Sequence, residues 1–228
     1  MRFPRRLAVL FAGLWSAAPV HAAETVDIGV LRNEDITVVQ QLLYPKTRRT
    51  EFGVHLGYVG FDAYVKSPNV QLSFARHLDE QLAISVVAGG GYGFKTSAYR
   101  ELESPTYGVA PYAYRYLGSV LAGVEYAPVY AKLNLDGARI VHFDVYGALR
   151  GGATVEQSVL PDAELAFAPT LSPAVGARFY LGQSAAMHVA FRDDLLVERR
   201  PLNQEWAFKQ NANVTVGLTF FSARPERR

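Results

Sequence analysis

Apolar and polar residues alternate with a period of two in segment after segment of this 228-residue chain. In "EFGVHLGYVGF", the apolar Phe52, Val54 and Leu56 alternate with Glu51 and His55. A β-strand sends successive side chains to opposite faces, so such a segment has one apolar face and one polar or small face. No apolar run is long enough for a transmembrane helix. The alternation therefore predicts an all-β protein.

Eight segments show this pattern and are predicted to be antiparallel strands. They are Glu51–Phe61, Val70–Ala75, Leu82–Phe94, Tyr112–Tyr126, Val141–Arg150, Thr170–Phe179, Met187–Asp194 and Asn211–Phe220. A soluble β-sandwich would turn the apolar faces inward, whereas a transmembrane β-barrel would turn them toward lipid. Most segments are longer than the ~5–6 residues usual for soluble strands. This length favours an eight-stranded antiparallel transmembrane β-barrel with a short N-terminal helical segment.

The connections and the aromatic residues also favour the barrel. The predicted outer loops 62–69, 95–111, 153–166 and 197–207 are mostly longer than the turns at the other end, as in outer-membrane barrels. Aromatic residues are expected at both ends of the strands, where a membrane barrel has its two girdles. The outer set is Tyr58, Phe61, Tyr92, Phe94, Tyr112, Tyr114, Phe167 and Phe208, and the inner set is Phe52, Phe74, Tyr126, Phe179 and Phe220.

Residues 1–22 are predicted to be a secretory signal peptide. Three arginines precede the apolar run Leu7–Trp15, and small residues indicate cleavage after Ala22. Residues 23–49 then form a periplasmic segment with a short helix near Asn33, which covers the barrel mouth, plugs the barrel or docks a partner. The barrel is expected over 50–221 and a tail over 222–228.

Charge and cysteine content exclude several classes of function. The chain has 23 Lys and Arg against 21 Asp and Glu, but the signal peptide holds three Arg and no acid, so the mature balance is 20 − 21 = −1. This balance gives no support for binding nucleic acid. With 0 cysteines, disulfides, thiolate zinc sites and covalent c-type haem are excluded. We expect no cofactor and no metal.

The glycine-rich stretch "VVAGGGYGFK" superficially suggests a phosphate-binding loop. That loop requires Gly-Lys-Ser/Thr, and here Phe94 separates Gly93 from Lys95. The interior of an eight-stranded barrel is only just wide enough for its side chains. We therefore expect Gly89, Gly91 and Gly93 to face the lumen and make room for arginine side chains from across the barrel.

The polar faces of the strands carry the charges that are expected to fill the lumen. The predicted lumen network is Glu51, His55, Arg115, Glu125, His142, Asp144, Arg150, Arg178, Arg192 and Asp194, with Arg115, Arg150 and Arg178 opposite the glycines. Buried charges are usually paired because an unpaired one is costly. The chain has no G-x-S-x-G elbow and no convincing metal-ligand spacing. These residues therefore indicate an ion-pair network rather than catalysis.

Several motifs are similar to those of a known family. "VVQQLLYPKTRRTEFGVHLGY", "GGGYGFK", "YRELESPTYGVAPYAYRYLGS" and "RDDLL" resemble the outer-membrane β-barrel domain proteins of myxobacteria and related Gram-negative bacteria, from about Val30 to Phe221. The chain departs from many such barrels because "SARPERR" follows its closing strand. The resemblance implies a small barrel of the OmpA/OmpX kind in the cell outer membrane.

We expect a structural or interaction role in the cell envelope. The partners would be outer-membrane lipid and other envelope proteins, met through the N-terminal segment or the extracellular loops. A narrow, porin-like channel or small-solute carrier is the alternative, and an outer-membrane lipid-modifying enzyme is a second one.

Overall fold

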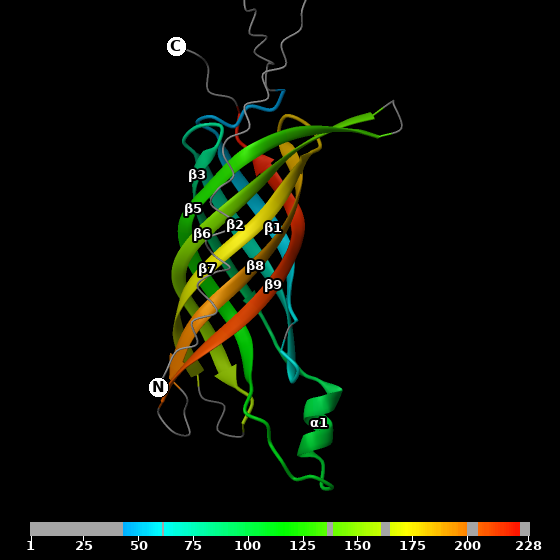
Figure 1. Cartoon of the computed structure of the whole chain (residues 1–228), viewed down its shortest axis with the longest axis vertical. Helices are drawn as coiled ribbons and strands as arrows, with labels where there is room; N and C mark the ends of the chain where they lie inside the picture. The colour runs from blue at the N-terminus through cyan, green and yellow to red at the C-terminus, as the bar shows by residue number, and fades with distance from the viewer. Residues whose placement is uncertain (1–42, 61, 136–138, 161–164, 200–204, 224–228) are drawn as a thin grey trace, which may run out of the picture. The chain divides into compact units, whose positions relative to one another are not determined.

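The computed structural model describes residues 43–60, 62–135, 139–160, 165–199 and 205–223. Figure 1 shows the elements that these residues form. They are β1 (Thr50–Val59), β2 (Val65–His77), β3 (Leu82–Gly91), β4 (Phe94–Lys95), α1 (Ser97–Glu103), β5 (Tyr114–Leu135), β6 (Arg139–Ser158), β7 (Leu165–Tyr180), β8 (Ala185–Arg199) and β9 (Trp206–Phe221). The predicted signal peptide and the helix near Asn33 lie outside the described residues.

Eight of these strands form a closed antiparallel ring. The order is β1-β2-β3-β5-β6-β7-β8-β9, and the ring closes because β1 pairs with β2 along one edge and with β9 along the other. Val54, for example, lies opposite Leu72 on one side and Leu218 on the other. The remaining strand, β4, has two residues and pairs with β2 beside the ring. The predicted all-β antiparallel fold is thus confirmed.

The outer face of the ring is apolar and the inner face is polar. Along β1, Phe52, Val54 and Leu56 are exposed, whereas Glu51 and His55 between them are buried. A soluble protein keeps its large apolar side chains inside. A closed barrel with the opposite arrangement satisfies its backbone hydrogen bonds within the ring and presents the surface that a lipid solvent requires.

The strands are longer than the alternation predicted. β5 has 22 residues and β6 has 20. The predicted outer loop 153–166 is largely strand, because the alternation of Thr154, Glu156 and Ser158 continues to the end of β6, and all three side chains are buried. β8 likewise continues to Arg199, well into the predicted loop 197–207. The described connection between β3 and β5, which carries α1, is the longest outer loop in this part of the chain.

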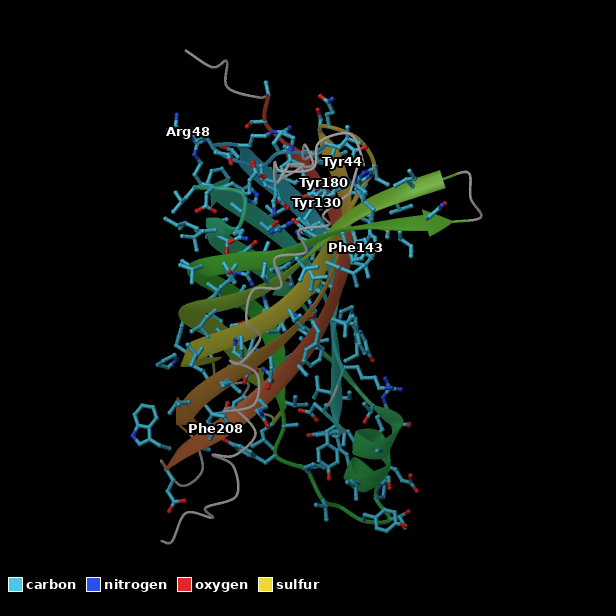
Figure 2. All side chains as sticks on the ribbon, turned by 45° about the horizontal axis from the view of Figure 1, so that its top comes forward. Tyr44, Arg48, Tyr130, Phe143, Tyr180 and Phe208 are labelled. Carbon is cyan, nitrogen blue, oxygen red and sulfur yellow. The ribbon has the colours of Figure 1, made fainter. Side chains whose placement is uncertain are left out.

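A β-bulge in β5 overturns part of the predicted aromatic girdle. The ladder between β5 and β6 shifts register between Tyr116 and Gly118. A bulge adds one residue to a strand and so reverses the faces on its two sides. Tyr114 and Tyr116 consequently point into the barrel and are buried, although Tyr114 was predicted to face outward with Tyr112. Phe208, another member of the predicted outer set, is exposed, and Figure 2 shows it at the opposite end of the barrel from Tyr44 and Tyr180. The bulge therefore changes only the part of the girdle on β5.

The turn between β2 and β3 supports a prediction about pH. The Asp79 carboxylate accepts hydrogen bonds from the backbone N–H groups of Gln81 (2.7 Å) and Leu82 (2.6 Å). These bonds hold the pKa of Asp79 below its ordinary value. A lowered pKa means that the carboxylate stabilises the fold at neutral pH and that this contribution is lost as the pH falls below about 4.

We therefore expect Asp79→Ala to destabilise the protein at pH 7 and to destabilise it less at pH 3. The measurement is urea unfolding of lipid-reconstituted protein at the two pH values. Asp79→Asn is the control, since it keeps an acceptor oxygen but cannot titrate. A stability gap between wild type and Asp79→Ala that is equal at both pH values would contradict this account of the turn.

Candidate functional site: the charged lumen

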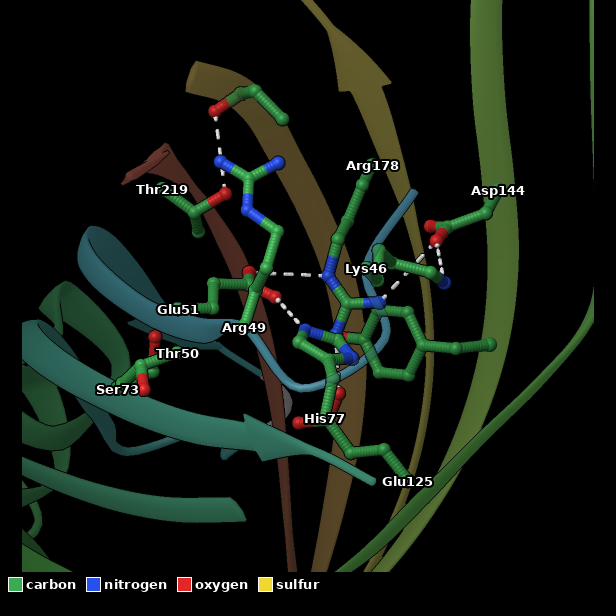
Figure 3. Close-up of polar contacts among 12 residues, drawn as sticks. Lys46, Arg49, Thr50, Glu51, Ser73, His77, Glu125, Asp144, Arg178 and Thr219 are labelled. Atoms are coloured by element: carbon green, nitrogen blue, oxygen red, sulfur yellow. Dashed lines mark hydrogen bonds and ion pairs between the residues drawn. The ribbon is translucent and has the colours of Figure 1, made fainter. Parts of the chain in front are cut away.

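A single guanidinium connects three carboxylates inside the barrel. Arg178, on β7, donates from Nε to Glu51 Oε1 at 3.1 Å and from Nη2 to Glu125, and its Nη1 lies 3.6 Å from Asp144 Oδ2. The three acids come from β1, β5 and β6, so Arg178 joins strands across the lumen (Figure 3). Its guanidinium also lies over the ring of Tyr146, 4.3 Å from the centroid.

Each of these carboxylates has a second partner. Arg150 donates to Glu125 Oε1 at 2.6 Å, and His77 Nε2 lies 2.9 Å from Glu51 Oε2. Lys46 forms an ion pair with Asp144. All of these side chains are buried. The cluster of Lys46, Arg150 and Arg178 with Glu51, Glu125 and Asp144, which we call the lumen ion-pair cluster, therefore balances three cations with three carboxylates. This pairing offsets the large cost of removing charges from water.

The residues that precede β1 close the nearby mouth of the barrel. The ring of Tyr44 stacks on Tyr180 with 5.0 Å between centroids. Arg49 donates from Nε to the Ser222 carbonyl at 2.8 Å and from Nη2 to the Gln183 carbonyl at 2.7 Å. The residues from Lys46 to Arg49 form a tight turn, in which the Arg49 N–H donates to the Lys46 carbonyl at 2.9 Å. Within this turn Arg48 has a positive φ of 61°. The described part of the N-terminal segment is thus a turn that places Lys46 in the lumen.

A chain of serine, histidine and tyrosine side chains adjoins the ion-pair cluster. Ser73 Oγ lies 2.7 Å from His55 Nε2, and His55 Nδ1 lies 3.1 Å from His188 Nδ1. His188 Nε2 is in turn 2.6 Å from the Tyr146 hydroxyl. A serine beside a histidine supplies two of the three members of a nucleophilic triad, and the third member is a carboxylate that orients the histidine. In this chain the group beside His55 is the imidazole of His188 and not a carboxylate. A cavity of about 30 Å³ borders these groups and has room for a water molecule or two.

The far half of the lumen holds a separate set of polar contacts. Arg192 donates to Asp194 Oδ2 at 2.9 Å, and the Ser172 hydroxyl donates to Asp194 Oδ1 at 2.6 Å. Toward the outer end, Glu156 accepts from Lys209 at 2.9 Å and from Asn211 at 2.6 Å. The described residues contain no group of three or more side chains placed to hold a metal ion. They also include no helix that is long and apolar enough to cross a membrane.

Comparison with known proteins gives no family for this chain. No family model matches it, and no curated protein matches its sequence. Among solved structures, the outer membrane protein OprG from Pseudomonas aeruginosa is 12% identical over 81% of this chain and 100% of its own, with a TM-score of 0.48. Neisserial surface protein A is 9% identical over 75% of this chain and 95% of its own, with a TM-score of 0.45.

A third similar structure is Ail, the attachment invasion locus protein of Yersinia pestis. It is 12% identical over 77% of this chain and 99% of its own, with a TM-score of 0.41. The barrel assignment rests on the closed hydrogen-bond ring. Membership of the myxobacterial family stays a prediction.

Most of the residues that the sequence places in the lumen lie in the barrel interior. Those buried there are Glu51, His55, Glu125, Asp144, Arg150, Arg178, Arg192 and Asp194. They do not form one site, because the lumen ion-pair cluster excludes His142, Arg192 and Asp194. His142 lies at the mouth, where its ring meets Tyr44 edge-on at 5.3 Å.

Arg115 is the exception, and its prediction is wrong. It is only half-buried, and its guanidinium donates to the hydroxyl of Tyr92 and lies over that ring at 4.9 Å. Tyr92 is exposed on the outer face. The bulge after Tyr116 explains the difference, because it reverses the faces of the strand on the N-terminal side.

The glycine row makes room mainly for side chains of a neighbouring strand, and of the three expected arginines only Arg115 lies against it, at Gly93. A Cβ on Gly89 would meet Gln71 at 2.7 Å, and one on Gly91 would meet Asn69 at 2.7 Å and the Pro68 carbonyl at 2.4 Å. These groups belong to the neighbouring strand β2. A Cβ on Gly93 would meet Ser67 and Val65, also of β2, and Arg115 Cβ, each at 2.6 Å. Arg150 and Arg178 are not among the nearest atoms of any of the three glycines.

Gly176, and not the row of Gly89, Gly91 and Gly93, makes room for a bulky side chain inside the barrel. A Cβ on Gly176 would lie 2.6 Å from the ring of Tyr146, its partner across the β6–β7 ladder. Because Gly176 has no side chain, the bulky ring of Tyr146 can occupy the space beside it.

Sequence reasoning missed Lys46, His77, Glu156 and Lys209. Lys46 and His77 fall in segments that were read as a periplasmic segment and a turn, and Glu156 falls in a predicted loop. The signal for Glu156 was present, since the alternation continues through "TVEQS". Lys46 contacts Asp144 across 98 residues of sequence, and no local pattern indicates such a contact.

Proposed function

We propose that this chain is an outer-membrane β-barrel with a structural or interaction role in the cell envelope, and that its lumen is closed by its own side chains. One observation carries the proposal: an eight-stranded ring has an apolar outer face and encloses a balanced ion-pair cluster. Such a surface is suited to lipid on the outside. Inside, the charges of the lumen ion-pair cluster are paired with one another and hold the strands in register.

The filling of the lumen argues against a simple pore. Arg178, Tyr146, Leu121 and Leu196 are almost completely buried inside the ring. Eight strands enclose a space that side chains can fill, whereas open aqueous channels are built from ~16–18 strands. The cavity beside the two histidines, about 30 Å³, has room for a water molecule or two but not for a larger solute. Contacts with partners therefore fall to the outer lipid-facing wall, the outer loops and the N-terminal segment.

We expect the purified full chain to show no steady, solute-sized conductance in a planar lipid bilayer. Insertion is checked in the same preparation by heat-modifiable migration on gels, which reports a folded barrel. Glu125→Gln is the diagnostic variant. In a sealed barrel it lowers stability, because Arg150 and Arg178 lose a buried partner. A reproducible open state in the wild type whose ion selectivity shifts in Glu125→Gln would replace this proposal with a channel.

A further inference from the structure

The hairpin of β5 and β6 extends beyond the rest of the barrel. Its neighbours stop short of it: β3 pairs with β5 as far as Tyr126, and β7 pairs with β6 from Phe143 onward. Val129–Leu135 of β5 pair with Arg139–Val145 of β6, and Arg139–His142 lie beyond the last residue of β6 that pairs with β7. We call this two-stranded extension the β5–β6 ribbon. It lies at the end of the barrel where β1 begins and β9 ends, and Figures 1 and 2 both show it leaning away from the ring.

A local irregularity accounts for the direction of the β5–β6 ribbon. The β5–β6 ladder shifts register between Tyr126 and Val129, at the point where the ribbon leaves the ring. Pro128 lies within this shift and has no N–H to donate. Bulges bend a strand and increase its twist. The ribbon therefore turns outward at its base instead of continuing parallel to the barrel wall.

One face of the β5–β6 ribbon and its base is apolar over three successive cross-strand pairs. These are Val129 with Val145, Ala131 with Phe143 and Leu133 with Val141, and the pair nearest the tip, Leu135 with Arg139, follows on the same face by register. Leu133 is 49% exposed and Val129 is 46% exposed. At the base, Phe143 stacks on Phe179 of β7 with 5.7 Å between ring centroids, which joins this face to the outer apolar face of the barrel.

The opposite face of the ribbon is mainly polar. It carries Lys132 and Asn134, which are exposed, and Ile140 beside the tip; nearer the base, Tyr130 lies against Tyr180 and His142 against Tyr44 at the barrel mouth. Two-stranded hairpins are at best marginally stable in water. An exposed apolar face on such a hairpin therefore needs a cover, and this one is continuous with a surface that has the character of a lipid contact.

We propose that the β5–β6 ribbon lies in the interfacial layer of the membrane leaflet at this end of the barrel, with its apolar face toward the acyl chains and its polar face toward water. This inference rests on the proposed function, because it requires the barrel to span a bilayer. An amphipathic element binds such an interface through its buried apolar area, and its polar face stays hydrated. The outward bend at the bulge turns the apolar face over the lipid beside the barrel wall instead of over the mouth.

Tryptophan fluorescence in bilayers of phosphatidylcholine brominated on the acyl chains tests this placement. The chain has two tryptophans, Trp15 and Trp206, and both are replaced by Phe in the full chain to give a silent background. Single tryptophans are then introduced as Leu133→Trp on the apolar face of the ribbon, Lys132→Trp on its polar face and Val216→Trp on the barrel wall. Heat-modifiable migration shows that each variant is folded.

We expect Leu133→Trp to emit at blue-shifted wavelengths and to lose most of its fluorescence to the brominated lipid, and Lys132→Trp to emit as in water with little quenching. Water-like emission from Leu133→Trp would overturn the inference, and so would blue-shifted emission without quenching, since that indicates a protein or a second copy as the cover. Val216→Trp separates the two proposals. If it is quenched and Leu133→Trp is not, only the ribbon inference fails. If neither is quenched, the membrane barrel itself fails.

Discussion

Replacing Arg178 by methionine is expected to lower the free energy of unfolding by about 3–5 kcal/mol, because three buried carboxylates lose the cation that they share and the cluster is left with one excess negative charge. Arg178 contacts Glu51, Glu125 and Asp144 and is almost fully buried. Methionine retains much of the side-chain volume, so the loss is mainly electrostatic. The measurement is urea unfolding of the barrel in detergent micelles or lipid, followed by its heat-modifiable migration.

Lys95→Met is the matched control for this prediction. Lys95 also forms an ion pair, with Glu103 of α1 at 2.8 Å, but both side chains are partly exposed. Exposed pairs contribute ~0.2–1 kcal/mol, so this variant is expected to be nearly neutral. A double variant, Arg178→Met with Glu51→Gln, is expected to recover part of the loss, because Glu51 loses its guanidinium partner in Arg178→Met whereas Glu125 keeps Arg150. Equal effects of Arg178→Met and Lys95→Met would show that the cluster does not stabilise the barrel.

The strand faces were predictable because they depend on local information. A period of two needs only neighbouring residues, and it placed Glu51, Glu125 and Arg178 on the same side as the structure does. The same rule failed at Tyr114 and Arg115, where one added residue reverses the faces. Nothing in the letters "YRYLGS" marks a bulge, because the bulge results from fitting β5 to β6.

The pairing inside the lumen was not predictable for a different reason. Which inward side chains meet depends on the stagger of the strands around the ring, and that stagger is a property of the closed barrel. The glycine row shows this. Gly89 and Gly91 do face small spaces, but the side chains that fill them come from β2, the neighbouring strand, and the aromatic ring of Tyr146 lies against Gly176 instead. Away from bulges the alternation indicates which face a residue joins, but the register of the closed ring decides its partner.

Arginine on the outer wall gives the second large effect, because it tests directly what surrounds the barrel. Val216 is outward-facing near the middle of β9, with the exposed Leu56 on one side and Val189 on the other. An arginine that faces lipid near the bilayer midplane costs about 2–4 kcal/mol. We therefore expect Val216→Arg to assemble poorly into lipid vesicles and to unfold at lower urea concentration than the wild type.

Val120→Arg is expected to behave in the same way, since Val120 is the most exposed apolar side chain of the ring portion of β5. Glu101→Arg, on the exposed surface of α1, adds the same side chain outside the apolar wall and should leave assembly unchanged. The comparison separates lipid from water as the outer solvent. In water an exposed arginine at position 216 is harmless, since surface substitutions are usually within ±0.5 kcal/mol. Assembly of Val216→Arg as efficient as that of Glu101→Arg would therefore mean that the apolar wall is covered by something other than a bilayer.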